Sequence, residues 1–188
     1  MPVGDSMLKT CDILDEKNKI LRQKSKEVVF PLTKEDKNLI KTMIKYLTDS
    51  QIEEKALKYD LRPGMGMSAV QLGVLKRIFV VVHEYEEGKF DNYILINPKI
   101  ISNSMEKIYV EEGEGCLSVN RPVDGIVPRY ARVTLEGYNE EGQKIHVRGR
   151  EELSIAFQHE LDHLDGILFF DHIDKKNPFK DKDLYRAI

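Results

Sequence analysis

The spacing of apolar residues changes twice along this 188-residue chain, and this change restricts the fold more than any other feature. Near the start, Thr33 can cap a helix. Behind it, apolar side chains recur at helical spacing at Leu39, Ile40, Met43, Ile44 and Leu47. The pattern continues weakly through Ile52, Ala56 and Leu57 and stops at Pro63 and Gly64. A helical pattern returns only at residues 151–165.

The stretch between these helices is rich in strand patterns. The buried strand 77–83 (RIFVVVH) is followed by a turn at residues 86–89. Further strands are expected at 93–96 (closed by Asn97-Pro98), 107–110, 132–137 and, after a hairpin turn at 139–142, at 144–147. The order helix, strands, helix predicts an α+β fold. We expect mixed or antiparallel sheets around a central last helix, with residues 1–188 forming a single domain.

Composition narrows the functional classes. The net charge is −3, with 29 basic and 32 acidic side chains, so overall charge gives no reason to expect sequence-specific nucleic-acid binding. A local patch could still touch RNA. Residues 1–10 are mixed and polar, unlike a secretory signal, and the apolar run 78–82 is too short to span a membrane. We therefore expect a cytoplasmic protein whose cysteines, Cys11 and Cys116, are reduced.

The segment from Gln158 to His163 carries the strongest chemical signal. His159 and His163 lie about one helical turn apart on one face, so both imidazoles can reach a single metal ion. Glu160 lies about 100° around the helix from His159 and about 60° from His163, so it can lean over the metal without binding it. A carboxylate in this place is suited to accept a proton from water.

Two histidines are too few for a catalytic zinc-type site, which usually takes three protein ligands. Upstream, Cys116 lies between two strand-like stretches, next to the flexible Gly115. Its thiolate would suit a borderline cation, although a small buried cysteine would look the same in the sequence. The downstream candidates have no familiar spacing: they are Asp165, Asp171 and His172. The residues alone leave the third ligand open.

The glycine-rich segment 64–71 (GMGMSAVQ) is ambiguous by itself. It is not a dinucleotide-binding fingerprint, because no strand clearly precedes it and Ala69 stands where the third glycine would be. It also lacks the Gly-Lys-Ser/Thr of a phosphate-binding loop. An ordinary tight loop leading into a short helix explains it equally well.

Together the three segments resemble the peptide deformylase family. That family has a G-x-G-x-A-A-x-Q-type loop, an E-G-C-L-S segment and a helical H-E-x-D-H, which stand here in the same order as GMGMSAVQ (64–71), EGCLS (114–118) and HELDH (159–163). The one departure is Ser68, where alanine is usual. Extra residues at 119–127 and 84–92 are similar to the longer deformylases of Gram-positive bacteria and their relatives, which implies a bacterial enzyme.

The resemblance implies a role for each matching residue. Glu160 would act as general base and then general acid, while Gln71 and the backbone N–H of Leu117 would stabilise the oxyanion. One divalent metal, Fe²⁺ natively with Zn²⁺, Ni²⁺ or Co²⁺ as substitutes, would be held by Cys116, His159 and His163. The groove for the substrate backbone would be lined by Gly64, Met65, Gly66, Glu114 and Gly115.

The resemblance also implies the reaction and the partners. The chain would hydrolyse the N-formyl group of formyl-methionyl nascent polypeptides, release formate and contact the ribosome transiently. Its tail after Asp174 is short, unlike the long C-terminal helix that some members use for docking. From their composition, rich in lysine and aspartate, the residues after Ile173 are expected to be exposed. Arg129 would pair with Glu114. For Asp162 two places are open, a contact behind the metal ligands or exposure to solvent, and the second is favoured. The methionine pocket could be walled by Met65, Ile155 and Ala156, which could equally be core residues.

Two alternatives remain. A small peptidase built on the same helical motif would take its third ligand downstream of His163 and would not need Cys116. A non-catalytic, metal-stabilised binding module would use the metal only to hold its fold. Glu160 speaks against the second alternative, because a structural site does not need it and is usually closed by a fourth ligand.

Overall fold

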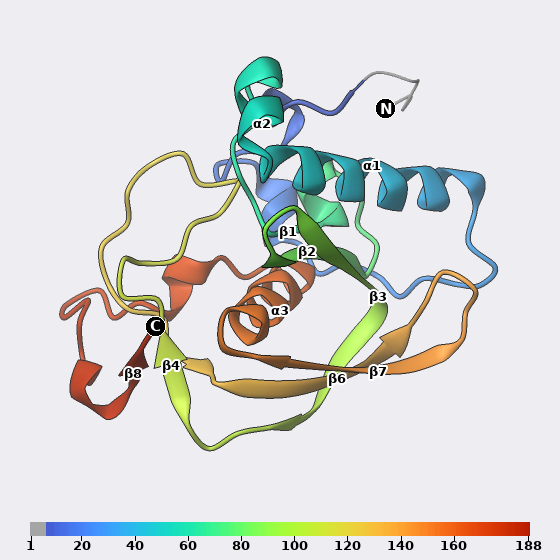
Figure 1. The fold of residues 1–188 in the computed structure, drawn as a ribbon. Coiled ribbons are helices and arrows are strands. Elements are labelled where there is room, and N and C mark those ends of the chain that lie inside the picture. The colour runs from blue at the N-terminus through green and yellow to red at the C-terminus, as the bar shows by residue number, and fades with distance from the viewer. Residues whose placement is uncertain (1–6) are drawn as a thin grey trace.

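The computed structural model describes residues 7–188 and shows helices packed on both sides of a strongly curved sheet (Figure 1). The helices are α1 (Lys34–Ser50), α2 (Glu53–Tyr59) and α3 (Glu151–Leu164), with short 3-10 helices η1 (Thr10–Asp12), η2 (Lys19–Arg22), η3 (Ala69–Leu72), η4 (Phe169–His172) and η5 (Lys182–Leu184). The strands are β1 (Gly66–Ser68), β2 (Ile78–Glu86), β3 (Lys89–Asn103), β4 (Lys107–Tyr109), β5 (Arg129–Tyr130), β6 (Arg132–Tyr138), β7 (Lys144–Arg150) and β8 (Arg186–Ala187).

The strands form two sheets. The larger has the order β1-β2-β3-β6-β7 and is antiparallel throughout. The smaller has the order β5-β4-β8, in which β4 pairs antiparallel with β5 and parallel with β8. In Figure 1 the larger sheet bends along β3, so that β1 and β2 lie above α3 and β6 and β7 run below it. The expected α+β class, with mixed and antiparallel sheets around the last helix, is confirmed.

The continuous apolar run of β2 is explained by burial on both faces. Ile78, Val80 and Val82 point to one side and join the core cluster that contains the apolar residues of α1. Phe79 and Val81 point to the other side and pack in the cluster that contains Phe157, Leu161 and Leu164 of α3. A strand buried on both faces needs no polar alternation. The two long helices therefore cover opposite faces of the same sheet.

Helix α1 begins as predicted. The Thr33 side chain accepts a hydrogen bond from the N–H of Asp36 at 3.1 Å, and the Asp36 carboxylate accepts one from the N–H of Thr33 at 3.2 Å. This reciprocal pair satisfies N–H groups that a helix start otherwise leaves free. The weak continuation of the pattern is a separate helix, α2, which ends where Asp60 adopts a left-handed conformation with φ of 52°.

The prediction that Asn97-Pro98 closes a strand is wrong. Strand β3 continues to Asn103, and its register against β6 shifts between Ile96 and Lys99. Asn97 has a φ of 52°, which asparagine tolerates, and its side chain bonds to the N–H and C=O of Val28 at 2.8 and 3.0 Å. This tertiary partner holds a bulge at which the strand bends without ending.

The tail after Ile173 is largely exposed, as expected, but it is anchored. Its last strand, β8, pairs with β4, and Arg186 bonds to Glu106 and Glu151. Within residues 7–188 no helix combines the length and apolarity needed to cross a bilayer. The prediction that residues 1–10 do not form a secretory signal includes residues 1–6, which lie outside the described residues.

Candidate metal centre

Helix α3 turns two imidazoles toward the same space. His159 and His163 are both buried, and their ring centroids lie 5.0 Å apart. The helix presents them on one side because four residues make about one turn. Its other apolar side chains, Phe157, Leu161 and Leu164, fix its orientation against the sheet.

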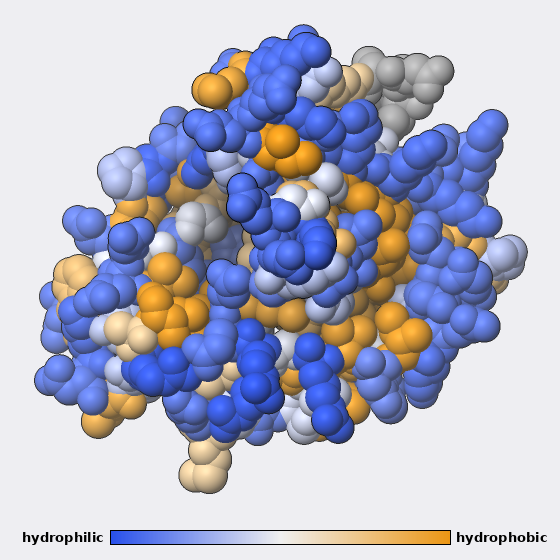
Figure 2. All heavy atoms as spheres, in the orientation of Figure 1, coloured by the Kyte–Doolittle hydropathy of each residue, from blue (hydrophilic) through white to orange (hydrophobic). Residues whose placement is uncertain are grey.

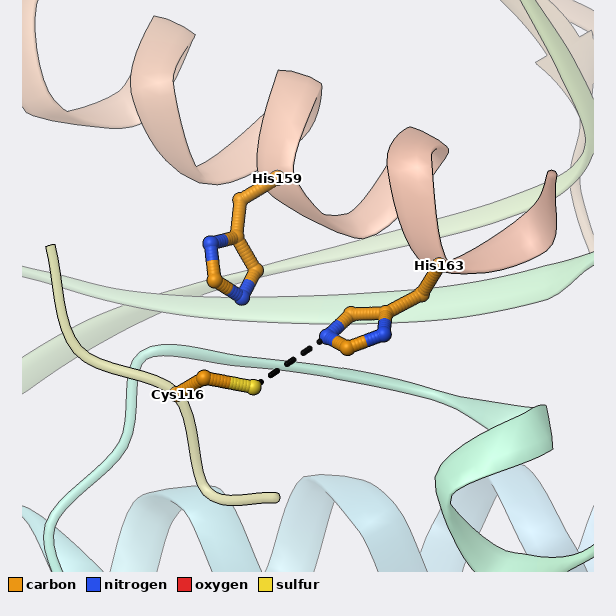
Figure 3. A group of neighbouring side chains, drawn as sticks. All are labelled: Cys116, His159 and His163. Atoms are coloured by element: carbon orange, nitrogen blue, oxygen red, sulfur yellow. Dashed lines mark hydrogen bonds between the residues drawn. The ribbon is translucent and has the colours of Figure 1, made fainter. Parts of the chain in front are cut away.

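The third member of the cluster comes from the loop between β4 and β5. The Cys116 Sγ lies 3.3 Å from Nε2 of His163 (Figure 3). Figure 3 shows all three side chains converging from the helix and the loop. One ligand atom from each of Cys116, His159 and His163 lies within 4.8 Å of the others, and all three residues are buried. Among residues 7–188, the downstream candidates Asp165, Asp171 and His172 form no such cluster.

The donor set fits a metal ion. One sulfur and two imidazole nitrogens in a buried site are the ligand types that zinc and similar borderline cations prefer, and three protein ligands leave a coordination position for catalysis. Burial opposes charge on His159, yet the Cys116 sulfur and the Glu114 carboxylate raise its pKa well above the usual value. Burial and the neighbouring His159 lower the pKa of His163. The sulfur and the Glu114 carboxylate thus favour one positive charge at His159, and His163 beside it stays neutral.

An ion-pair network holds the His159 ring at its Nδ1, on the side away from the cluster. Its Nδ1 lies 3.0 Å from Oε1 of Glu114, so its Nε2 is left to face the cluster. Arg129 donates to both Glu114 oxygens, at 2.9 and 3.0 Å, as expected. Burial would raise the pKa of Glu114, but His159 and Arg129 outweigh it and lower that pKa to about 2. Such a carboxylate sets the orientation and tautomer of a ligating histidine.

Of the two places considered for Asp162, the favoured one, exposure to solvent, is wrong. Its Oδ2 accepts a hydrogen bond from Nη1 of Arg129 at 2.6 Å and lies 2.8 Å from Nε2 of His172. Asp162 thus completes a chain of contacts from His172 through Arg129 and Glu114 to His159. No local pattern predicts these contacts, because His172 reaches Asp162 only after the turn that follows α3.

Glu160 projects from α3 into a buried place beside the glycine-rich segment. The Ser68 hydroxyl lies 2.7 Å from Oε2 of Glu160 and 3.0 Å from its backbone oxygen. A Cβ on Gly66 would come within 2.6 Å of Oε1, so only glycine lets the backbone pass so close. Burial raises the pKa of Glu160 to about 7, although His159 and Ser68 act in the opposite direction.

Ser68 is a functional candidate that sequence reasoning missed. The sequence analysis assigns no role to the serine that replaces the usual alanine, but its hydroxyl is fully buried and bonds to Glu160. The signal was the departure itself, since a buried hydroxyl requires a hydrogen-bond partner.

Gln71 reaches the cluster from η3. Its side-chain oxygen accepts a bond from the N–H of Ser68 at 2.9 Å. Its Nε2 lies 3.0 Å from Oγ of Ser118 and 3.8 Å from Sγ of Cys116. The N–H of Leu117 has no acceptor among the described residues and is free to donate to a ligand. The segment 64–71 and the EGCLS segment therefore bring two donors beside the same three buried side chains.

The residues expected to line the groove have different surroundings. A Cβ on Gly64 would meet the Leu117 side chain at 2.7 Å, whereas one on Gly115 would meet no atom within 4 Å. Met65 and Ala156 are partly buried against the α3 core cluster, while Ile155 packs with Ile108 and Ala131 in a separate cluster. A methionine pocket made of all three is not supported by this packing. Cys11 is exposed and, like Cys116, free of any disulfide.

Comparison with known proteins decides the family. The model of the polypeptide deformylase family matches residues 10–179. The chain belongs to this family. Peptide deformylase 2 of Bacillus anthracis is 45% identical over 177 residues, covering 94% of this chain and 96% of that one. Peptide deformylase of Macrococcus caseolyticus is 48% identical over 176 residues, covering 93% and 95%.

Solved structures agree with this assignment. The probable peptide deformylase of Synechococcus phage S-SSM7 superposes with a TM-score of 0.70 at 34% identity, covering 86% of this chain and 98% of that one. Peptide deformylase of Thermotoga maritima gives a TM-score of 0.67 at 29% identity, covering 86% and 96%. The expected resemblance to deformylases of Gram-positive bacteria is confirmed. As a peptide deformylase, the chain is a hydrolase that removes formyl groups.

Proposed function

We propose that this chain removes the formyl group from the N-terminal formyl-methionine of nascent polypeptides and releases formate, using a divalent metal held by Cys116, His159 and His163. The observation that carries this proposal is the convergence of these three ligand atoms within 4.8 Å, from a loop and a helix far apart in the sequence. Chance burial would not also supply the ion-paired Glu114 behind His159.

We propose Fe²⁺ as the native ion, with Zn²⁺, Ni²⁺ or Co²⁺ able to replace it. A divalent cation there would supply Lewis acidity, which makes water nucleophilic near neutral pH. The thiolate of Cys116 would give the site more negative charge than a third histidine would. It would also make the site sensitive to oxidation.

Glu160 would move the proton. Ser68 holds Oε2 at 2.7 Å, and Oε1 lies over Gly66, where no side chain intervenes. Oε1 is therefore the atom that would take a proton from the attacking water and later pass it to the departing amine nitrogen. The glycine leaves room for this oxygen, and the serine keeps the carboxyl group from rotating.

Two donors would stabilise the negative charge that develops on the formyl oxygen. The Gln71 amide is held by Ser68 and Ser118, and the Leu117 N–H has no other acceptor in the described residues. Donors fixed in advance stabilise a transition state without reorganisation, and each is typically worth about 10²–10³ in rate. The peptide backbone would lie along Gly64, Met65 and Gly66 on one side and Glu114 and Gly115 on the other.

The setting of the enzyme follows from its substrate. We propose that the chain acts in the bacterial cytoplasm, meets formyl-methionyl nascent peptides, contacts the ribosome transiently and does not read nucleic-acid sequence. We further propose that residues 1–188 form one catalytic domain. The bacterial relatives and the site on a single continuous fold support this setting.

The deciding experiment pairs metal analysis with formate release under anaerobic conditions. Cys116→Ala is expected to lose most of its metal and its hydrolysis of a formyl-methionyl dipeptide. Cys11→Ala is the matched control, because Cys11 is exposed and outside the cluster, and it is expected to keep both. A Cys116→Ala variant that binds metal as the wild type does would contradict the proposal and favour a peptidase with a downstream ligand.

A further inference from the structure

The outward face of the β6–β7 hairpin carries a row of basic side chains. Along β7 the exposed positions alternate with half-buried or buried ones, and the exposed residues are Lys144, His146, Arg148 and Arg150. The inward-facing Ile145 and Val147 pack against the α3 core cluster. The row therefore faces solvent on the side of the sheet opposite α3.

Beside this row the surface is hollowed. A hollow of about 330 Å³ is lined by Ser102, Asn103, Ser104, Arg132, Val133, Thr134, Arg148, Gly149 and Arg150. Three of these are arginines, three carry hydroxyl groups, and none is acidic. In Figure 2 the most hydrophilic residues, in the deepest blue, gather along the lower edge, where Figure 1 places β6 and β7.

The pairing of β6 with β7 brings positive charges together, which destabilises the sheet unless an anion neutralises them. Arg132 and Arg150 are direct partners in the β6–β7 register, where like charges destabilise a sheet. Arg132 is offset by Glu106 at 3.2 Å, but Arg148 and Arg150 have no carboxylate partner among residues 7–188. Glu136, farther along the face, is already paired with Lys99, Lys144 and His146.

Charges on an edge strand also hinder pairing with a second sheet, and β7 is an edge. That explanation accounts for the row on β7. It does not account for Arg132 on the inner strand β6, nor for the hydroxyl groups that line the same hollow. Guanidinium and hydroxyl groups together are the donors that proteins use for phosphate oxygens.

We propose that this face, the Arg132–Arg148–Arg150 surface, binds the phosphate backbone of RNA. Arg148 and Arg150 are two residues apart on one face of a strand, about 6.8 Å along it, so they can contact successive groups of an extended polyanion. No residue of the hollow belongs to the metal site, so the two sites share no side chain. The choice of RNA rests on the proposed function, because nascent polypeptides emerge from a particle made largely of RNA.

The test measures binding of the full chain to a short fluorescein-labelled single-stranded RNA of mixed sequence by anisotropy over a range of salt concentrations. Arg148→Gln/Arg150→Gln is expected to bind about tenfold or more weakly at low salt. The slope of log K against log salt should shrink by about 1.4, because each phosphate contact contributes about 0.7 for single strands. The charge-retaining variant Arg148→Lys/Arg150→Lys is expected to keep most of the affinity and the slope.

The matched control is Lys37→Gln/Lys41→Gln, which removes the same charge from exposed positions on α1 and is expected to bind RNA as the wild type does. Three results would overturn the proposal: equal RNA binding by Arg148→Gln/Arg150→Gln and wild type, equal losses in both glutamine variants, or binding of polyglutamate or anionic lipid vesicles as tight as that of RNA. Formate release from a free formyl-methionyl dipeptide should be the same in every variant. A wild type that binds RNA without releasing formate would refute the proposed function alone.

Discussion

Helices α1 and α3 cover opposite faces of one sheet, but they bury different kinds of side chain. The buried residues of α1 are mostly apolar, apart from Asp36 and Asp49 near its ends and the terminal Ser50. Helix α3 buries an apolar side as well, together with five polar residues, namely Ser154, Gln158, His159, Glu160 and His163. One helix is built to stabilise the fold, and the other also carries the chemistry.

The buried carboxylates show the difference most clearly. Burial alone would raise the pKa of Asp36, but hydrogen bonds from Lys76 and Thr33 outweigh it and hold that pKa below the ordinary value. Asp49 behaves in the same way between Lys45 and Lys55. Glu160 has no lysine or arginine within ion-pair distance in the described chain, and burial raises its pKa to about 7.

The partner of a buried acid, rather than its burial alone, decides whether the carboxylate stays charged. A carboxylate paired with lysine stays charged and contributes to stability. A carboxylate left with one hydroxyl partner exchanges its proton more readily, at a cost in folding free energy. Natural proteins accept such costs at functional sites.

The largest effect should come from removing the unpaired acid. Glu160→Gln keeps the shape of the side chain and an oxygen for the Ser68 hydroxyl, but it cannot transfer a proton. Formate release should fall by about 10²–10⁴. The free energy of unfolding should stay equal or rise, because a buried ionisable group is removed. Steady-state kinetics and denaturant unfolding measure the two quantities.

Metal content is the control for Glu160→Gln and should match the wild type, because Glu160 is not one of the three proposed ligands. A variant with full metal and a rate within a few-fold of the wild type would show that Glu160 does not move the proton. Glu160 would then differ from Asp36 and Asp49 in its pKa but not in having a catalytic role.

Much of this architecture could be predicted because its signals are local. The cap at Thr33, the apolar spacing of α1 and the pair His159 and His163 each depend on residues within one or two helical turns. Cys116 could be joined to the histidines only through the family resemblance. No spacing rule connects a loop residue to a helix more than 40 positions later, although the structure places Sγ 3.3 Å from His163.

The features that sequence missed depend on distant partners. Strand β3 passes through Asn97 because Val28 satisfies its side chain, and β8 is too short to show a period before it pairs with β4. Asp162 is held by Arg129 and His172, and Ser68 by its contact with Glu160. Each is a polar contact between segments, which apolar periodicity does not encode.

A middle-sized effect, on stability alone, is expected from the apolar face of α1. Leu47 is fully buried in the cluster shared with β2. Leu47→Ala should lower the free energy of unfolding by about 2–5 kcal/mol, through lost transfer energy and the cavity left behind. The rate of formate release per folded molecule should not change, and urea unfolding together with active-site titration would measure both. A rate loss exceeding the loss of folded protein would show that α1 also shapes the site.

The smallest effect is expected from the paired acid of α1. Asp36→Asn keeps an oxygen for the N–H of Thr33 but loses the charged contact with Lys76, so the free energy of unfolding at pH 7 should fall by roughly 1–2 kcal/mol. Because folding lowers the pKa of Asp36, its carboxylate contributes fully above the ordinary value of 3.8. That contribution disappears as the pH falls through the lowered folded pKa. The difference between the two proteins should therefore close in acid, as measured by urea unfolding at a series of pH values. A difference that persists at the acid end would mean that the asparagine disturbs the cap itself, and the charge pair would then not be what separates Asp36 from Glu160.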